Sequence, residues 1–175
     1  MGDPKKSRKK YDTPRSTWQA DQIARELWLV GKYGLRNKRE LWTAETELSR
    51  IRNQARKLLA EPIDTRAETE KRLLRSLIRK GLIGSSSSLD DILGLTVESL
   101  IERRLQSMVK SKGLVSSIQA ARQAVTHGHI KVGDRRVTIP SYLVRIDEES
   151  TVRLIEGSTL AKLMVESVPP APKEE

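Results

Sequence analysis

Two histidines separated by one glycine are the residues of this chain whose types could support catalysis or metal binding. His127 and His129 lie in the stretch THGHIKVGDRR, and the sequence contains no other histidine and no cysteine. A zinc site uses about four ligands, so two histidines leave much of that shell to be filled from elsewhere. No Ser-His-Asp or paired-carboxylate arrangement accompanies them, which disfavours acid–base catalysis. We therefore expect no catalytic residue, no metal and no cofactor.

A second interpretation places the histidines on a nucleic-acid-binding surface. His127 is expected at the C-terminal end of a helix, where the helix dipole favours a side chain that can also donate to a phosphate or ribose. For His129, at the start of a strand, a structural role and an RNA contact are equally open. Arg135 and Arg136 follow in the same stretch.

The charge of the chain favours a polyanionic partner. The 175 residues include 33 Lys and Arg against 23 Asp and Glu, a net charge of +10. The excess lies in two blocks: residues 1–60 carry 15 basic and 7 acidic side chains, and residues 101–145 carry 9 and 2. Such segregation suits a protein that lays two surfaces along a phosphate backbone.

The sequence has no sign of a membrane or secretory segment. No apolar run is long enough to span a bilayer, and the first residues lack the apolar core of a signal peptide. The lack of cysteine is compatible with a reducing compartment. We expect a soluble, cytoplasmic protein without a membrane partner.

The N-terminal half is predicted to be a basic extended arm over residues 1–15 and a helical domain over residues 16–95. The first helix is expected to start at the capping box of Ser16 and Gln19 and to end near Tyr33. Its buried face is expected to consist of three apolar residues: Ile23, Leu27 and Val30.

A second helix is predicted after Asn37, with Glu40 three residues on, and Pro62 is expected to close it. Apolar residues recur along it at spacings of three and four: Leu41, Ala44, Leu48, Ile51, Ala55 and Leu58. A third helix is expected to start at the capping box of Thr65 and Glu68.

The third helix is expected to end at Gly81, and four serines then mark a loop near the domain boundary. A short apolar turn at Ile92 and Leu93 leads to Thr96, a predicted N-cap.

The second domain is predicted over residues 96–165, before a disordered acidic and proline-containing tail at 166–175. One helix is expected from Val97 to Gly113, with Arg103, Arg104, Lys110 and Lys112 pointing outward. A shorter helix is expected to be capped by Ser116 or Ser117 and to end at Gly128.

After Gly128 the period drops toward two, which predicts short strands in HIKV, RRVTI and TVRLI, with Gly133 and Asp134 in a type II′ turn. The expected fold is α+β: a helical domain followed by two helices packed on a small antiparallel sheet.

Three segments of the second domain, RRLQSMV, SSIQAARQAVTHGHIKVG and VTIPSYLV, resemble the small RNA-binding module called the S-four domain. The first half agrees independently, because YGLRNKRELWTAETELSRIRNQARKLL and LDDILGLTVESLIERRLQ resemble the archaeal and eukaryotic form of the small-subunit ribosomal protein S-four family. Two positions depart from the module's pattern: Ile118 stands where a basic residue is common, and Gly133-Asp134 replaces the usual Asn-Gly turn.

The resemblance implies a non-enzymatic, structural constituent of the small ribosomal subunit. It implies binding to the 5′ domain of small-subunit ribosomal RNA, a part in nucleating assembly, and a position beside ribosomal protein S-five and other small-subunit proteins. It also implies a contribution to translational accuracy and proximity to mRNA at the entry channel. We expect no homo-oligomer.

The resemblance also implies a set of RNA-binding positions in the module: Arg103, Arg104, Ser117, Arg122, Gln123, His127, Lys131, Arg135 and Arg136. Charge and position add further candidates, which are Lys5, Lys6, Arg8, Lys9, Lys10, Arg15, Arg36, Lys38, Arg39, Arg50, Arg56 and Lys112.

Two rival functions are weaker. An RNA-modifying enzyme would need an active-site constellation that residues 1–100 do not offer. A helix-turn-helix regulator would read duplex DNA as a symmetric dimer. Neither explains two separated basic blocks as well. Trp18, Trp28 and Trp42 could stack on bases, but their helical positions favour core or interface packing.

Overall fold

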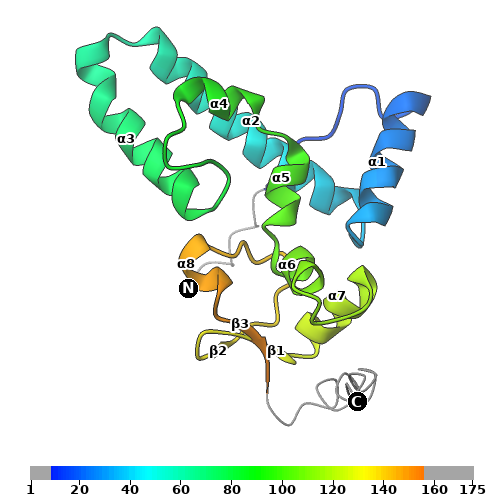
Figure 1. Ribbon diagram of the computed structural model, residues 1–175. Helices are drawn as coiled ribbons and strands as arrows, with labels where there is room; N and C mark the ends of the chain where they lie inside the picture. Colours follow the sequence, from blue (N-terminus) through cyan, green and yellow to red (C-terminus); the bar gives the residue numbers. More distant parts are fainter. Residues whose placement is uncertain (1–8, 156–175) are drawn as a thin grey trace, which may run out of the picture. The chain divides into compact units, whose positions relative to one another are not determined.

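A computed structural model describes residues 9–155, apart from the side chains of residues 63 and 64. Figure 1 shows a helical chain with one small sheet, so the α+β fold is confirmed. The helices are α1 (Ala20–Lys32), α2 (Lys38–Ala60), α3 (Ile63–Arg79), α4 (Leu89–Gly94), α5 (Val97–Glu102), α6 (Leu105–Ser111), α7 (Ile118–Thr126) and α8 (Ile146–Glu149). The strands are β1 (Ile130–Val132), β2 (Arg135–Arg136) and β3 (Val152–Leu154).

The described residues form two units. The first contains residues 9–74 and 86–101, and the second contains residues 75–85 and 102–155.

In the first unit, α1 and α4 pack on α2. Helix α2 starts where the sequence predicts, because the Asn37 side chain accepts a hydrogen bond from the backbone N–H of Glu40 at 3.2 Å. It ends before Pro62, and the predicted apolar stripe of α2 is buried throughout. The stripe therefore forms the core of this unit.

The start and the buried face of α1 differ from the prediction. The helix begins at Ala20, and no side chain caps it; Ser16 only accepts a turn hydrogen bond from the backbone N–H of Gln19. Glu26 and Leu29 are buried, whereas Leu27 is 56% exposed. Hydrophobic periodicity failed here because a glutamate takes a core position, for reasons given below.

Two of the three tryptophans lie outside the core. Trp18 is 90% exposed and Trp28 is 57% exposed, so core packing is wrong for both, while interface packing stays a prediction. Trp42 is partly buried and donates its indole N–H to Glu26 at 3.0 Å.

Helices α3 and α4 also differ in detail from the prediction. Helix α3 starts at Ile63, so Thr65 lies in its first turn and donates its hydroxyl to the Pro62 carbonyl instead of capping the helix. The predicted apolar turn at residues 92–93 is part of α4, whose N-terminus is closed by a capping box between Ser88 and Asp91. The predicted Thr96 cap is confirmed, since its hydroxyl accepts from the backbone N–H of Ser99.

The predicted single helix over 97–113 is wrong. It is broken at residues 103–104, between α5 and α6. The backbone N–H of Leu105 donates to the Tyr142 carbonyl at 2.7 Å, and the N–H of Val144 donates to the Arg103 carbonyl at 2.9 Å. These groups would otherwise continue the helix, so pairing with a segment forty residues away ends α5 and starts α6.

The sheet of the second unit has the order β2-β1-β3, with both pairings antiparallel. Gly133 has a φ of 60°, and no residue other than glycine has a positive φ among those described, as the predicted type II′ turn requires. Only residues 135–136 of the predicted strand RRVTI pair as β2, and α8 was not predicted.

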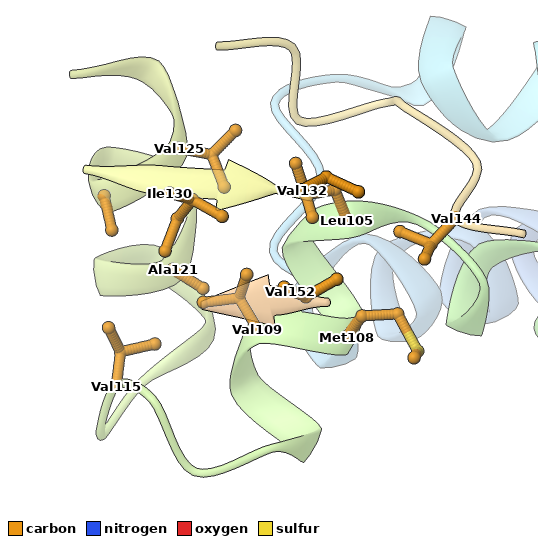
Figure 2. Packing of buried hydrophobic residues seen from close by; sticks show 11 residues of the cluster. Leu105, Met108, Val109, Val115, Ala121, Val125, Ile130, Val132, Val144 and Val152 are labelled. Carbon is orange, nitrogen blue, oxygen red and sulfur yellow. The ribbon is translucent and has the colours of Figure 1, made fainter. Parts of the chain in front are cut away.

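Side chains from α6, α7 and the sheet form the core of the second unit. Figure 2 shows these side chains converging between the helices and the strands. Leu105, Val109, Val125 and Ile130 have no exposed surface. This core fixes the end of α7 against the β1–β2 hairpin, which positions the candidate site.

Gly128, at the end of α7, offers a test of this arrangement. Its φ is 73°, and a Cβ there would overlap the guanidinium of Arg136. We expect Gly128→Ala to lower the free energy of unfolding by about 1–2 kcal/mol, through the left-handed backbone alone, and to displace Arg136. Gly94→Ala is the control, because a Cβ at Gly94 meets nothing within 4 Å. Thermal melts that fall equally for both variants would contradict this.

Candidate nucleic-acid interface

The C-terminal end of α7 and the β1–β2 hairpin form the centre of the site. Ser117 caps α7 as predicted, accepting from the backbone N–H of Ala120 at 3.1 Å. At the other end, Arg136 lies across Gly128 and donates Nη2 to the His127 carbonyl at 2.8 Å. A cation at a helix C-terminus is favoured by the helix dipole. The hydrogen bond therefore joins two predicted RNA-binding residues from different elements.

Three cations lie directly opposite one another across the sheet. Lys131 in β1 faces Arg136 in β2 and Arg153 in β3. Their side chains share the face away from the core, because the neighbours of Lys131, Ile130 and Val132, are both buried. Like charges directly opposite in an antiparallel pair repel each other. We call this set the cation row.

Arg153 is a residue that sequence reasoning missed. It lies in a C-terminal stretch whose acidic residues outnumber the basic ones, and its position opposite Lys131 appears only when β3 pairs with β1. The alternating pattern of TVRLI, which places Arg153 on the polar face, is the signal that could have indicated it.

Other exposed polar residues surround the end of α7. Gln123, His127 and Arg135 are exposed, while Arg122 is half-buried and donates to Gln106 at 3.3 Å. His129 is also half-buried, and its backbone N–H donates to the Ala124 carbonyl.

Arg103 and Arg104 do not point outward, so that expectation is wrong. Arg104 is 5% exposed, because its backbone pairs with Leu143 inside the unit. Arg103 donates to the Val144 carbonyl at 3.0 Å and forms an ion pair with Glu149 at 2.9 Å. The Arg103 guanidinium thus binds the protein's own chain, and the Arg104 side chain is buried within it.

The Lys112 side chain also binds within the protein: it is half-buried, and its ammonium group donates to the Glu149 carbonyl. The outward orientation predicted for Lys112 is therefore wrong, whereas Lys110 is exposed as expected.

The described part of the basic arm is attached to α2. Tyr11 stacks on Trp42 with ring centroids 6.0 Å apart, and the backbone N–H of Asp12 donates to Thr46 at 2.9 Å. Lys9 and Arg39 lie 4.7 and 5.6 Å from the centre of the Tyr11 ring. The root of the arm therefore has a fixed place beside α2.

The remaining N-terminal candidates differ in their surroundings. Exposed cations are Lys10, Arg15, Arg36, Arg50 and Arg56, of which Arg56 donates to Asn53 at 2.9 Å. Lys38 forms an ion pair with the buried Glu26 at 2.9 Å. Lys5, Lys6 and Arg8 lie outside the described residues.

Glu26 and Glu45 lie close enough in the first unit to repel each other. Burial raises the pKa of Glu26, but hydrogen bonds from Trp42 and Lys38 outweigh it, so the pKa of Glu26 is lowered. Burial also raises the pKa of Glu45, and the negative charge of Glu26 raises it further. The buried Glu26 carboxylate is therefore stabilised by its hydrogen-bond partners. The ionised carboxylate of Glu45 is destabilised by burial and by the charge of Glu26, and we call it the strained carboxylate.

The two histidines lie near each other, with ring centroids 6.3 Å apart. Within residues 9–155, no group of three or more His, Cys, Asp or Glu could hold a metal ion. Nor is any helix in that range long and apolar enough to cross a membrane.

Comparison with known families decides where the chain belongs. The model for the ribosomal protein S4/S9 N-terminal domain matches residues 5–102, more than half of the chain, and the S4 domain model matches residues 103–150. The chain belongs to the ribosomal protein S4 family. The resemblance in the sequence is thereby confirmed.

Curated relatives of the family are similar over most of their length. The chain is 52% identical over 152 residues to small ribosomal subunit protein uS4 of Ignicoccus hospitalis, covering 87% of this chain and 92% of that protein. It is 48% identical over 166 residues to the uS4 of Hyperthermus butylicus, covering 95% and 94%. The uS4 of Saccharolobus solfataricus is 52% identical over 153 residues, covering 87% and 84%.

The strained carboxylate gives a pH-dependent prediction. Because the pKa of Glu45 lies above its ordinary 4.5 in the fold, its ionised form costs stability at neutral pH. That cost disappears as the pH falls below 4.5, where the carboxyl group is protonated in both the folded and unfolded states. Glu45→Gln should therefore raise the melting temperature at pH 7, with a smaller gain at about pH 3.5.

The control for this prediction is Glu68→Gln, because Glu68 is an exposed residue of α3 whose ion pair with Arg72 lies on the surface. We expect it to change stability by less than about 0.5 kcal/mol at either pH. A gain for Glu45→Gln that is equal at both pH values would refute the assignment.

Proposed function

We propose that the protein is a structural constituent of the small ribosomal subunit that binds small-subunit ribosomal RNA. Membership of the ribosomal protein S4 family supports this role, and the relatives are themselves named as small-subunit proteins. The cation row is the structural observation that supports the RNA-binding part of this proposal.

The cation row is unfavourable in the free protein and favourable with a polyanion. Lys131 stands opposite an arginine on each side, so its charge is repelled from both. A phosphate backbone laid along this face neutralises the three charges and releases counterions from the RNA. The arrangement is therefore suited to phosphate binding.

Polar groups next to the row supply further contacts. His127 and Gln123, exposed at the end of α7, can donate to ribose 2′-hydroxyls or phosphates, and Arg135 extends the basic surface along β2. Because Arg103 and Arg104 are held by the protein itself, their role in this proposal is to position the hairpin and not to contact RNA directly.

The first unit provides a second basic surface in this proposal. It consists of the arm, whose root is attached to α2, and the exposed arginines of α2. Two such surfaces suit folded RNA read by shape. By family resemblance, we place the contact in the 5′ domain, early in assembly, beside ribosomal protein S-five and near mRNA, with a contribution to translational accuracy.

The experiment that tests this proposal measures the affinity of the full chain as a function of salt. The ligands are a 5′-domain fragment of small-subunit RNA, a folded RNA of unrelated sequence, and duplex DNA. We expect the fragment to bind more tightly than both other ligands, with a steep salt dependence. Equal affinity for all three ligands would mean that binding depends only on the net charge of the protein.

The cation row gives a prediction in which two readouts move in opposite directions. Lys131→Gln removes both like-charge pairs, so it should stabilise the free protein by about 0.2–1 kcal/mol. The same change should weaken RNA binding and reduce the salt slope by about one. Lys71→Gln, at an exposed position of α3, is the control and should alter neither quantity appreciably. Loss of stability together with loss of binding would indicate a structural role for Lys131 instead.

A further inference from the structure

The solvent side of α1 carries an apolar seam. Ala20, Ala24, Leu27 and Gly31 are all exposed and are spaced by four, three and four residues. Residues at these spacings lie on one side of a helix, and this is the pattern by which two helices pack along each other. The seam spans about three turns, or roughly 17 Å.

Large apolar side chains increase the cost of leaving the seam in water. Leu27 is 56% exposed and Trp28, which borders the seam, is 57% exposed. Exposed apolar patches mark interaction sites, and tryptophan is enriched among the residues that dominate binding. Figure 1 shows α1 in blue beside α2, which it contacts through its other side, where Glu26 and Leu29 are buried. The seam is therefore not the face that folds this unit.

The small residues of the seam allow a close approach. A Cβ built on Gly31 would meet nothing within 4 Å. Ala20 and Ala24 add only one methyl group each, so a partner helix can pack with a short distance between the axes. A partner of this shape would cover Leu27 and Trp28 at the same time.

The charges that border the seam argue against RNA. Lys32 forms an ion pair with Glu98 at 2.9 Å and lies 4.6 Å from the centre of the Trp28 ring. Arg25 attracts the carboxylate of Glu45. Lys32 is thus paired with a carboxylate and Arg25 lies within electrostatic range of another, whereas binding a polyanion is favoured by uncompensated cations. A face that is apolar at its centre and neutral at its edge complements a protein surface.

We propose that the α1 seam docks an amphipathic helix of another protein of the small subunit. This inference rests on the proposed function, since it places the chain among other small-subunit proteins. It adds a protein-binding surface in the first unit to the RNA-binding surface of the second.

The experiment measures the oxidation of α1 side chains by hydroxyl radicals in the full chain. Trypsin cleavage after Arg25 and Lys32 isolates the peptide ELWLVGK, which carries Leu27 and Trp28. The peptide is compared in the free chain, in the complex with protein-free small-subunit RNA, and in subunits reconstituted with the full set of small-subunit proteins.

We expect the oxidation rate to stay unchanged on RNA alone and to fall by about threefold when the other proteins are present. Ala24→Glu and Gly31→Glu place a charge in the seam at exposed positions and should abolish the protection. Ala67→Glu, at an exposed position of α3, is the matched control and should keep it. Circular dichroism confirms that each variant is folded.

Four outcomes would overturn this proposal and leave the proposed function intact. Protection on RNA alone would make RNA the occupant, and co-sedimentation with complete subunits without protection would mean that nothing covers the seam. Protection that survives both seam variants would place the contact elsewhere. A free chain that dimerises in sedimentation equilibrium, and does so only with an intact seam, would make a second copy the occupant. Failure to co-sediment with the RNA at all would instead refute the proposed function, and this inference with it.

Discussion

Backbone pairing between residues 103–106 and residues 140–144 is the constraint on which the second unit depends. Backbone N–H and carbonyl groups that would have joined α5 and α6 into one helix are hydrogen-bonded instead to a segment about forty residues further along the chain. Once the chain turns there, α6 can pack against α7, and the segment after the hairpin can return to form β3. Arg103 strengthens the same junction through its contacts with Val144 and Glu149. Pairing of β3 with β1 then places Arg153 opposite Lys131 and completes the cation row.

The elements that sequence reasoning predicted correctly are those with local signals. Asn37 and Ser117 cap α2 and α7 with their own side chains, and Gly128 and Gly133 take the positive φ that ends a helix or turns a hairpin. The break at residues 103–104 has no local signal, because VESLIERRLQSMVKSKG keeps its helical period across it. Its cause is tertiary, and tertiary partners override local propensity.

In the candidate site, too, residues within a local motif could be predicted from the sequence, whereas those placed by tertiary pairing could not. Lys131 and Arg136 could be named from a motif, but Arg153 could not, since only strand register places it opposite Lys131. Arg104 was expected at the surface because it falls on the polar face of a continuous helix over residues 97–113, and only the structure shows it buried. For α1, Ile23 and Val30 of the predicted face are half-buried, but Leu27 is exposed because Glu26 takes the core position, where Trp42 and Lys38 satisfy its carboxylate.

The cation row also bears on the fate of copies that are made in excess. Repulsion along the row lowers the stability of the free chain, and a bound phosphate backbone removes that repulsion. If the row binds RNA as proposed, an unassembled copy opens more often than an assembled one and is degraded sooner by proteases that act on unfolded chains. Under the proposed function, the three charges that would bind the RNA would thus also limit the lifetime of molecules that have not bound it.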